Sequence, residues 1–210
     1  MNGSTALEGA VELLDRSLAY TRVMLADVRP DTLDRPTPCT GWTLGHLLAH
    51  MEDALDAFTE AAAGRVEVDP IPPTSTRVDA LREKACALLG AWTAARPASD
   101  RVEVGDVGID APLLVATAAL EITVHGWDVG QATGRRTPIP ENLAEGLLAI
   151  ARQVIDPADR GSRFASPREA EPRASAGVRL LSWTGRVPAH MTEPLLGNSG
   201  EPTARRGLAS

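Results

Sequence analysis

The chain of 210 residues has few aromatic side chains, a single lysine and two cysteines. Aromatic residues make up only 3% of it, so leucine, valine and alanine must fill the core. Lys84 is the only lysine, and the net charge of −7 argues against a nucleic-acid binder, because the phosphate backbone demands a basic face. Cys39 and Cys86 provide no disulfide framework and are compatible with a reducing compartment.

Long apolar runs are missing as well. No run reaches the roughly 20 residues that a membrane-spanning helix needs. The first residues, "MNGSTALEGAVELLDRS", have neither the basic start nor the apolar stretch of a signal peptide. We therefore expect a cytoplasmic protein that binds neither nucleic acid nor membrane and acts on a small molecule. Its length predicts a single domain over residues 1–190 and a mobile tail over 191–210.

The periodicity of apolar residues predicts a helical protein. Leucine, valine and alanine recur at helical spacing in four long segments, and proline- or glycine-rich stretches separate them. We expect helices over residues 5–27, 43–63, 77–95 and 112–132, and shorter ones over 140–155 and 176–186. The stretch 101–112 is predicted to be a loop with, at most, a short extended piece. The fold class that follows is all-α: an antiparallel four-helix bundle with an extra C-terminal helical segment.

The stretch "LEITVHGWDVGQATG" places three ionisable groups in the fourth predicted helix. Glu121 and His125 are four residues apart and share a helix face, where they can hold one metal ion together or simply hydrogen-bond to each other. Asp128 lies three residues further on. Asp128 either orients a metal ligand from behind or pairs with an arginine such as Arg135.

The second predicted helix offers a third ligand. His46 and His50 are again four residues apart, in "GWTLGHLLAHM". One of them, with Glu121 and His125, completes the ligand set of a catalytic zinc site that keeps an open position. The same set suits iron, nickel or manganese. His46 lies in the first turn and is expected to be a cap-region or pocket-rim residue. The helix dipole there disfavours a protonated imidazole, so His46 is also a candidate general base.

Other candidate residues have a weaker case. Cys39 could reach a metal as a thiolate, but a small buried thiol is the commoner outcome. Trp42 and Trp127 adjoin the candidate site and are expected to be core aromatics. His190 belongs to the predicted tail. The sequence shows no glycine pattern for nucleotide binding and no nucleophile elbow.

The motifs "PTPCTGWTLGHLLAHM" and "LEITVHGWDVGQATG" resemble the DinB-like superfamily, and within it the metal-binding domain of the mycothiol-dependent maleylpyruvate isomerase group. The ending "RFASPREAEPRASAGVRLLSWTGRVP" is similar to that of an actinobacterial metal-binding subgroup. The resemblance implies an up-down-down-up bundle whose metal ligands fall on His50, Glu121 and His125. It also implies a low-molecular-weight thiol, such as mycothiol, as cosubstrate. Where the group usually has another polar residue, often Asp, this chain has His46. The isomerase has a further C-terminal domain, which we do not expect here.

Three functional hypotheses follow. The first is a divalent-metal enzyme, with zinc as the expected metal and nickel or iron as alternatives, that uses a mycothiol-type thiol on a small electrophile. In that enzyme His46 or Asp128 would carry the proton. The second keeps the metal site and activates water, giving a hydrolase or hydratase. The third is a non-catalytic metal-binding or ligand-binding module, in which an exposed apolar stripe on the first or third helix would favour a homodimer.

Overall fold

Helices make up most of the fold, which confirms the predicted all-α class. The structure, a computed structural model, describes residues 3–64, 77–94, 101–104, 107–161 and 164–188. The predicted tail over 191–210 and His190 lie outside these residues. Within them the helices are α1 (Gly3–Met24), α2 (Leu44–Ala61), α3 (Arg77–Ala94), α4 (Ala111–Thr133), α5 (Glu141–Val154) and α6 (Ala176–Trp183). Short 3-10 turns span Leu25–Asp27, Pro30–Thr32 and Pro157–Asp159.

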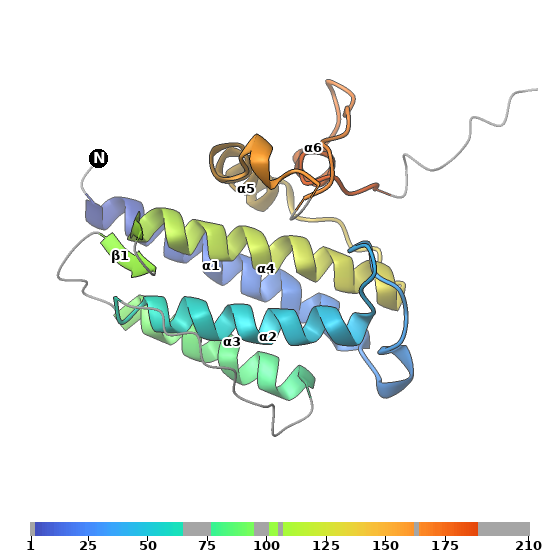
Figure 1. The fold of residues 1–210 in the computed structure, drawn as a ribbon, viewed down its shortest axis with the longest axis horizontal. Helices are drawn as coiled ribbons and strands as arrows, with labels where there is room; N and C mark the ends of the chain where they lie inside the picture. Colours follow the sequence, from blue (N-terminus) through green and yellow to red (C-terminus); the bar gives the residue numbers. More distant parts are fainter. Residues whose placement is uncertain (1–2, 65–76, 95–100, 105–106, 162–163, 189–210) are drawn as a thin grey trace, which may run out of the picture.

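The first four helices form the bundle. Figure 1 shows α1 and α4 running in one direction and α2 and α3 in the other, which is the up-down-down-up order that the family resemblance implies. The two pairs in closest association are α1 with α4 and α2 with α3. The indole of Trp92 on α3 donates to the carbonyl oxygen of Phe58 on α2 at 2.9 Å. That bond joins the ends of the second pair.

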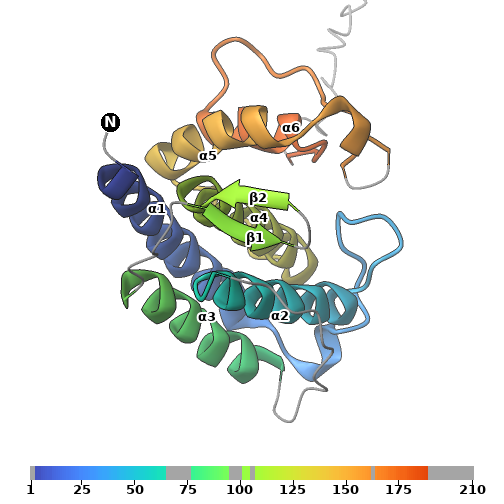
Figure 2. The same cartoon turned by 60° about the vertical axis from the view of Figure 1, so that its left-hand side comes forward.

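Helix α4 is the centre of the molecule. Figure 2 shows it surrounded by α1, α2 and α5, and most of its side chains are buried. A helix that is buried on nearly every side must be apolar nearly all round, and the sequence of α4 meets this condition outside its ionisable residues. Polar side chains on such a helix are held away from bulk water by the fold itself.

A glycine allows α1 to approach α4 closely. A methyl group placed on Gly126 would lie 2.3 Å from the Oγ1 atom of Thr21 on α1. That hydroxyl donates to the carbonyl oxygen of Ile122, one turn earlier on α4, at 2.8 Å. The two helices are therefore joined by a buried hydrogen bond at Ile122, between Glu121 and His125 on α4, which fixes the depth of that segment.

The stretch predicted to be a loop contains a two-stranded sheet. Strands β1 (Arg101–Val104) and β2 (Val107–Asp110) pair in antiparallel fashion, with Val102 opposite Ile109. Val102 is almost fully buried. Four-residue strands with glycines beside them give too little alternation to be distinguished from a loop by sequence alone. Burial of Val102 against the bundle stabilises the pair.

Helices α5 and α6 cover one side of the bundle. Their apolar faces pack on each other, and the indole of Trp183 donates to the carbonyl oxygen of Ala151 at 3.1 Å. The predicted C-terminal helical segment is thus confirmed, and it brings residues 184–186 back to α4. None of the described helices combines the length and the apolar character that a bilayer span requires.

Candidate metal centre

Two helices bring the three predicted ligands together. His50 lies in the second turn of α2, and Glu121 and His125 lie on successive turns of α4. The Nε2 atom of His50 is 2.9 Å from Oε1 of Glu121, and the Nε2 atom of His125 is 3.0 Å from the same oxygen. The rings of the two histidines meet edge to face with centroids 5.0 Å apart. One carboxylate oxygen and two imidazole nitrogens therefore converge on one point.

The charges of this cluster are coupled. Burial opposes ionisation of Glu121, but His125 and His50 outweigh it and hold the pKa of Glu121 well below its usual value. Burial also disfavours the charged imidazole of His125, yet Glu121 and Asp128 raise its pKa well above 6.5. In the absence of a metal, a proton on His125 thus neutralises the anionic oxygen that a cation would bind.

Behind His125 stands a second layer of polar side chains. The Nδ1 atom of His125 lies 3.1 Å from Oδ2 of Asp128, which is fully buried. Arg186 donates from Nη2 to the same oxygen at 2.7 Å and from Nε to the other carboxylate oxygen at 3.3 Å. Burial works against the charge of Asp128, but the Arg186 guanidinium beside it keeps its pKa below the usual value. Asp128 thereby fixes which nitrogen of His125 faces Glu121.

The end of α6 explains how Arg186 reaches Asp128. Gly185 adopts a positive φ of 80°, which a residue with a side chain rarely tolerates, and ends the helix. The backbone N–H of Arg186 then donates to the carbonyl oxygen of Leu181 at 2.8 Å, the bond that marks a Schellman turn. This turn reverses the chain and directs it toward the centre of α4.

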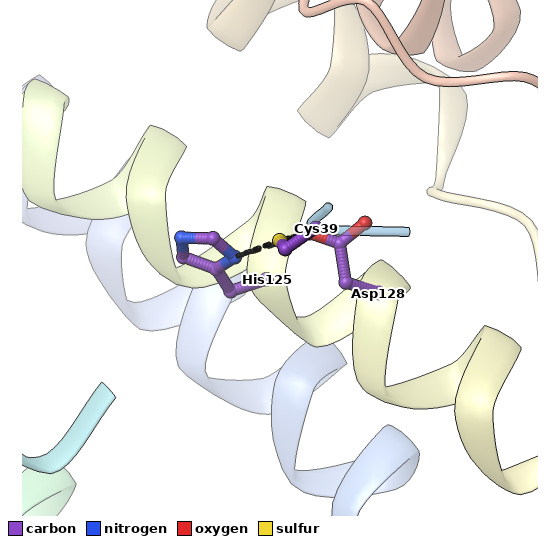
Figure 3. Close-up of side chains that lie close together, drawn as sticks. All are labelled: Cys39, His125 and Asp128. Carbon is purple, nitrogen blue, oxygen red and sulfur yellow. Dashed lines mark hydrogen bonds and ion pairs between the residues drawn. The ribbon is translucent and has the colours of Figure 1, made fainter. Parts of the chain in front are cut away.

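Cys39 joins the same layer from a tight loop. In that loop the N–H of Thr37 donates to the carbonyl oxygen of Trp42 at 3.1 Å. The Sγ atom of Cys39 lies 3.3 Å from Oδ2 of Asp128 and 3.8 Å from Nδ1 of His125. Figure 3 shows Cys39 beside these two side chains of α4.

Two residue sets in the described part of the chain have the spacing of metal ligands. They are His50, Glu121 and His125, and Cys39, His125 and Asp128. In the second set the guanidinium of Arg186 already supplies the cation, 2.7 Å from Asp128 and 3.7 Å from the sulfur of Cys39. Among the described residues, the close ion-pair partners of Glu121 are the two imidazoles, and Arg186 acts on it only at longer range. The first set therefore fits a divalent metal, and its two nitrogens and one oxygen are typical of zinc enzymes.

His46 lies apart from this cluster. Its residue is exposed, and its Nδ1 atom accepts from the backbone N–H of Thr43 at 3.4 Å. The hydroxyl of Thr43 in turn accepts from the N–H of His46 at 3.3 Å, so the pair forms a capping box at the start of α2. Both bonds join His46 to Thr43, and both stabilise the start of α2. A catalytic role for His46 stays a prediction, and this position lends it no support.

Of the other predictions from the sequence, one is confirmed and two are wrong. Trp127 is buried as expected, but Trp42 is 37% exposed and lies edge-on to the ring of His50 at 5.1 Å. Arg135, offered as a partner for Asp128, instead donates to Asp27 at 2.6 Å. Sequence reasoning missed Arg186. The sequence offered one signal for it: a buried Asp128 needs a cation beside it. That signal does not identify which arginine supplies the cation.

Two cavities meet at Glu121 and His125 of the candidate metal centre. One, which we call the loop cavity, has a volume of about 460 Å³ and is lined from the 38–42 loop and from residues 161–186 by Cys39, Trp42, His50, Phe164, Thr184 and Arg186. The other, the bundle cavity, has a volume of about 410 Å³ and lies among α1, α2, α3 and α4. Glu121 and His125 line both. A molecule in either cavity can thus reach the same carboxylate and imidazole.

Comparison with known proteins places the chain in a family. A crystal structure of the mycothiol-dependent maleylpyruvate isomerase matches 69% of each chain with a TM-score of 0.52 and 21% identity, which shows a common fold. Two uncharacterized proteins of Mycobacterium tuberculosis, from strains CDC 1551 and H37Rv, are each 32% identical over 172 residues, covering 78% of this chain and 90% of the relative. The model of the mycothiol maleylpyruvate isomerase N-terminal domain matches residues 14–130. The chain therefore belongs to the mycothiol maleylpyruvate isomerase N-terminal domain family.

Proposed function

We propose that the protein is a divalent-metal enzyme that uses a low-molecular-weight thiol of the mycothiol type on a small electrophile. The observation that carries this proposal is the convergence of His50, Glu121 and His125 at the meeting point of two cavities. Membership of a family described by a mycothiol enzyme supports the thiol. Zinc is the metal that we expect, and nickel or iron can use the same ligands.

The protein side chains provide a prepared site. His50, Glu121 and His125 would hold the metal, and their side chains are 37%, 30% and 10% exposed, so that a small molecule can reach them. When bound, a divalent metal lowers the pKa of a coordinated thiol and keeps its sulfur nucleophilic at neutral pH. Asp128 and Arg186 keep the ring of His125 in place, and the ring of Trp42 stands beside His50.

In the reaction the thiol gives its proton to solvent, and its sulfur bonds to an electrophilic carbon. Solvent returns a proton to the leaving group or, when the C–S bond breaks again, to the sulfur. If the new C–S bond is kept and a leaving group departs, the enzyme is an S-transferase. If the bond breaks again after the substrate has rearranged, the thiol is regenerated and the enzyme acts as a thiol-dependent isomerase. The loop cavity is the better position for the thiol, because its lining includes the polar groups of Cys39, Thr184 and Arg186. Cytoplasmic location and a homodimer stay predictions from sequence.

A cobalt-substituted protein tests this proposal. Addition of mycothiol should produce a sulfur-to-cobalt absorption band in the near ultraviolet, and Cys39→Ser should give the same band, because the sulfur comes from the cosubstrate. A loaded protein that shows no such band would contradict thiol binding at the metal. Turnover of an ester probe without thiol by that same protein would identify the hydrolase in its place.

A further inference from the structure

The bundle cavity is a second approach to the metal centre, distinct in chemistry from the loop cavity. It opens among the four bundle helices and is lined largely by aliphatic side chains, among them Leu18, Leu25, Met51, Leu55, Leu81 and Leu89. Its volume of about 410 Å³ falls in the range of sites for small organic ligands. Water in such a cavity gains few hydrogen bonds, so an apolar ligand displaces it at little cost.

The polar groups of this cavity are distributed unevenly. Asp15, Arg22 and Arg82 line it and are exposed, so they mark where the cavity reaches the protein surface. Glu121 and His125 also line it, and they belong to the metal centre. The aliphatic walls lie on α1, α2 and α3. A ligand that fills the cavity therefore places an apolar body against leucines and one polar end at the metal centre.

Glu121 and His125 are the two residues that the linings of the two cavities share. The loop cavity brings Cys39, Thr184 and Arg186 to one side of this pair, and the bundle cavity brings leucines to the other. Such a division suits a reaction between two unlike molecules. A hydrophilic thiol and an apolar electrophile can each occupy a matched cavity and meet at the metal centre without exchanging places.

We propose that the bundle cavity binds the apolar body of the electrophilic substrate, with the reacting carbon at the Glu121–His125 end. The substrate class that follows is an aliphatic or aryl electrophile with a single polar end, rather than a short molecule charged at both ends. This inference rests on the proposed function for the position of the reacting end. The presence of an apolar ligand site in the cavity can be measured independently of it.

The first experiment uses 1-alkanols from butanol to octanol with the metal-free protein, measured by isothermal titration calorimetry. Each added methylene should tighten binding about fourfold until the cavity is full, because its burial is worth about 0.8 kcal/mol. Ala85 on α3 lines the cavity and Ala87, two residues on, is exposed and outside the lining. Ala85→Trp should remove the dependence on chain length, and Ala87→Trp should keep it.

Leu89→Ala provides a second test in case Ala85→Trp fails to fold. This change enlarges the cavity from a half-buried position on α3, so the chain length that binds best should become longer. Circular dichroism of all three variants confirms that the bundle is intact. Alkanol binding that is the same in wild type, Ala85→Trp and Leu89→Ala would overturn the proposal, because the alkanol would then lie elsewhere.

The second experiment uses n-alkyl hydroxamates with the zinc-loaded protein, after metal content has been measured by elemental analysis. The hydroxamate head chelates a metal and the alkyl tail extends from it. Affinity should rise with tail length in wild type and in Ala87→Trp but not in Ala85→Trp. A loaded protein that binds all hydroxamates with equal affinity would overturn the link between the cavity and the metal centre. A protein that takes up no zinc would refute the proposed function instead, and the alkanol series would still decide whether the cavity binds apolar ligands.

Discussion

Replacement of Asp128 by asparagine tests the support behind the proposed metal centre. Asp128 is fully buried and Arg186 is 10% exposed, and the guanidinium contacts both carboxylate oxygens. Asp128→Asn keeps the shape of the side chain and removes its charge. The variant leaves a buried guanidinium without its counter-ion and leaves the Nδ1 atom of His125 without a carboxylate acceptor.

The expected loss of stability can be worked from this geometry. Breaking a buried ion pair by removing one partner costs about 3–5 kcal/mol. The amide oxygen of asparagine can still accept one N–H from Arg186, so we expect the lower end, about 3 kcal/mol. For a chain of this size that corresponds to a fall in melting temperature of about 6–12 °C. Zinc affinity should fall about 10- to 100-fold, since His125 loses its orienting partner and the site loses a negative charge.

Asp27 provides the matched control. It forms the same kind of pair with Arg135, at 2.6 Å, but on the surface, where such pairs contribute little. Urea unfolding and competitive zinc titration would be run on Asp128→Asn, Asp27→Asn and Asp128→Asn/Arg186→Met. The double variant removes both charges and should recover part of the lost stability.

Two results would refute this reasoning. If Asp128→Asn loses no more stability than Asp27→Asn, the buried pair with Arg186 does not form. If Asp128→Asn loses stability but binds zinc as tightly as wild type, then Asp128 supports the fold and does not orient His125.

Three further predictions concern the helices around the site. Gly126→Ala should lower stability by about 1–3 kcal/mol, because the new methyl group would meet the Thr21 hydroxyl at 2.3 Å, whereas Gly90→Ala, at an open helical position, should raise it by about 0.5–1 kcal/mol; urea unfolding measures both. Burial raises the pKa of Glu52, so its ionisation favours the unfolded chain. Glu52→Gln should therefore gain stability relative to wild type as pH rises from about 4 to 7. A difference in melting temperature between the two proteins that stays constant across this range would contradict this prediction. His125→Ala should lose zinc and keep its helical circular dichroism, because the apolar faces of the bundle carry the folding energy, and global unfolding would show a structural metal.

The helices, and the proximity of two of the three proposed metal ligands, follow from local patterns in the sequence. Apolar residues at helical spacing predicted every described α-helix within a few residues, and Gly134 ends α4 with a positive φ as its position suggested. Glu121 and His125 lie on successive turns of one helix and share its face, so their proximity needed no knowledge of the fold. Only the choice between His46 and His50 required more than spacing.

What sequence reasoning missed depends on distant contacts. Arg186 reaches Asp128 across 58 residues, through the turn at Gly185, and no local pattern encodes that contact. A place for His46 in the cap region was one reading of the sequence, but its two bonds to Thr43 were not predicted, because the third helical position of a capping box normally carries Glu or Gln. The bundle cavity arises from the space left between four helices, which no single helix specifies.

Metal content of His50→Ala and His46→Ala, measured side by side by elemental analysis after zinc loading and dialysis, tests the central claim most directly. His50 contributes a nitrogen 2.9 Å from Glu121, while His46 is occupied at the start of α2. We predict about one zinc per chain in wild type and His46→Ala and essentially none in His50→Ala. A full site in His50→Ala together with an empty one in His46→Ala would contradict it and move the ligand by one helical turn.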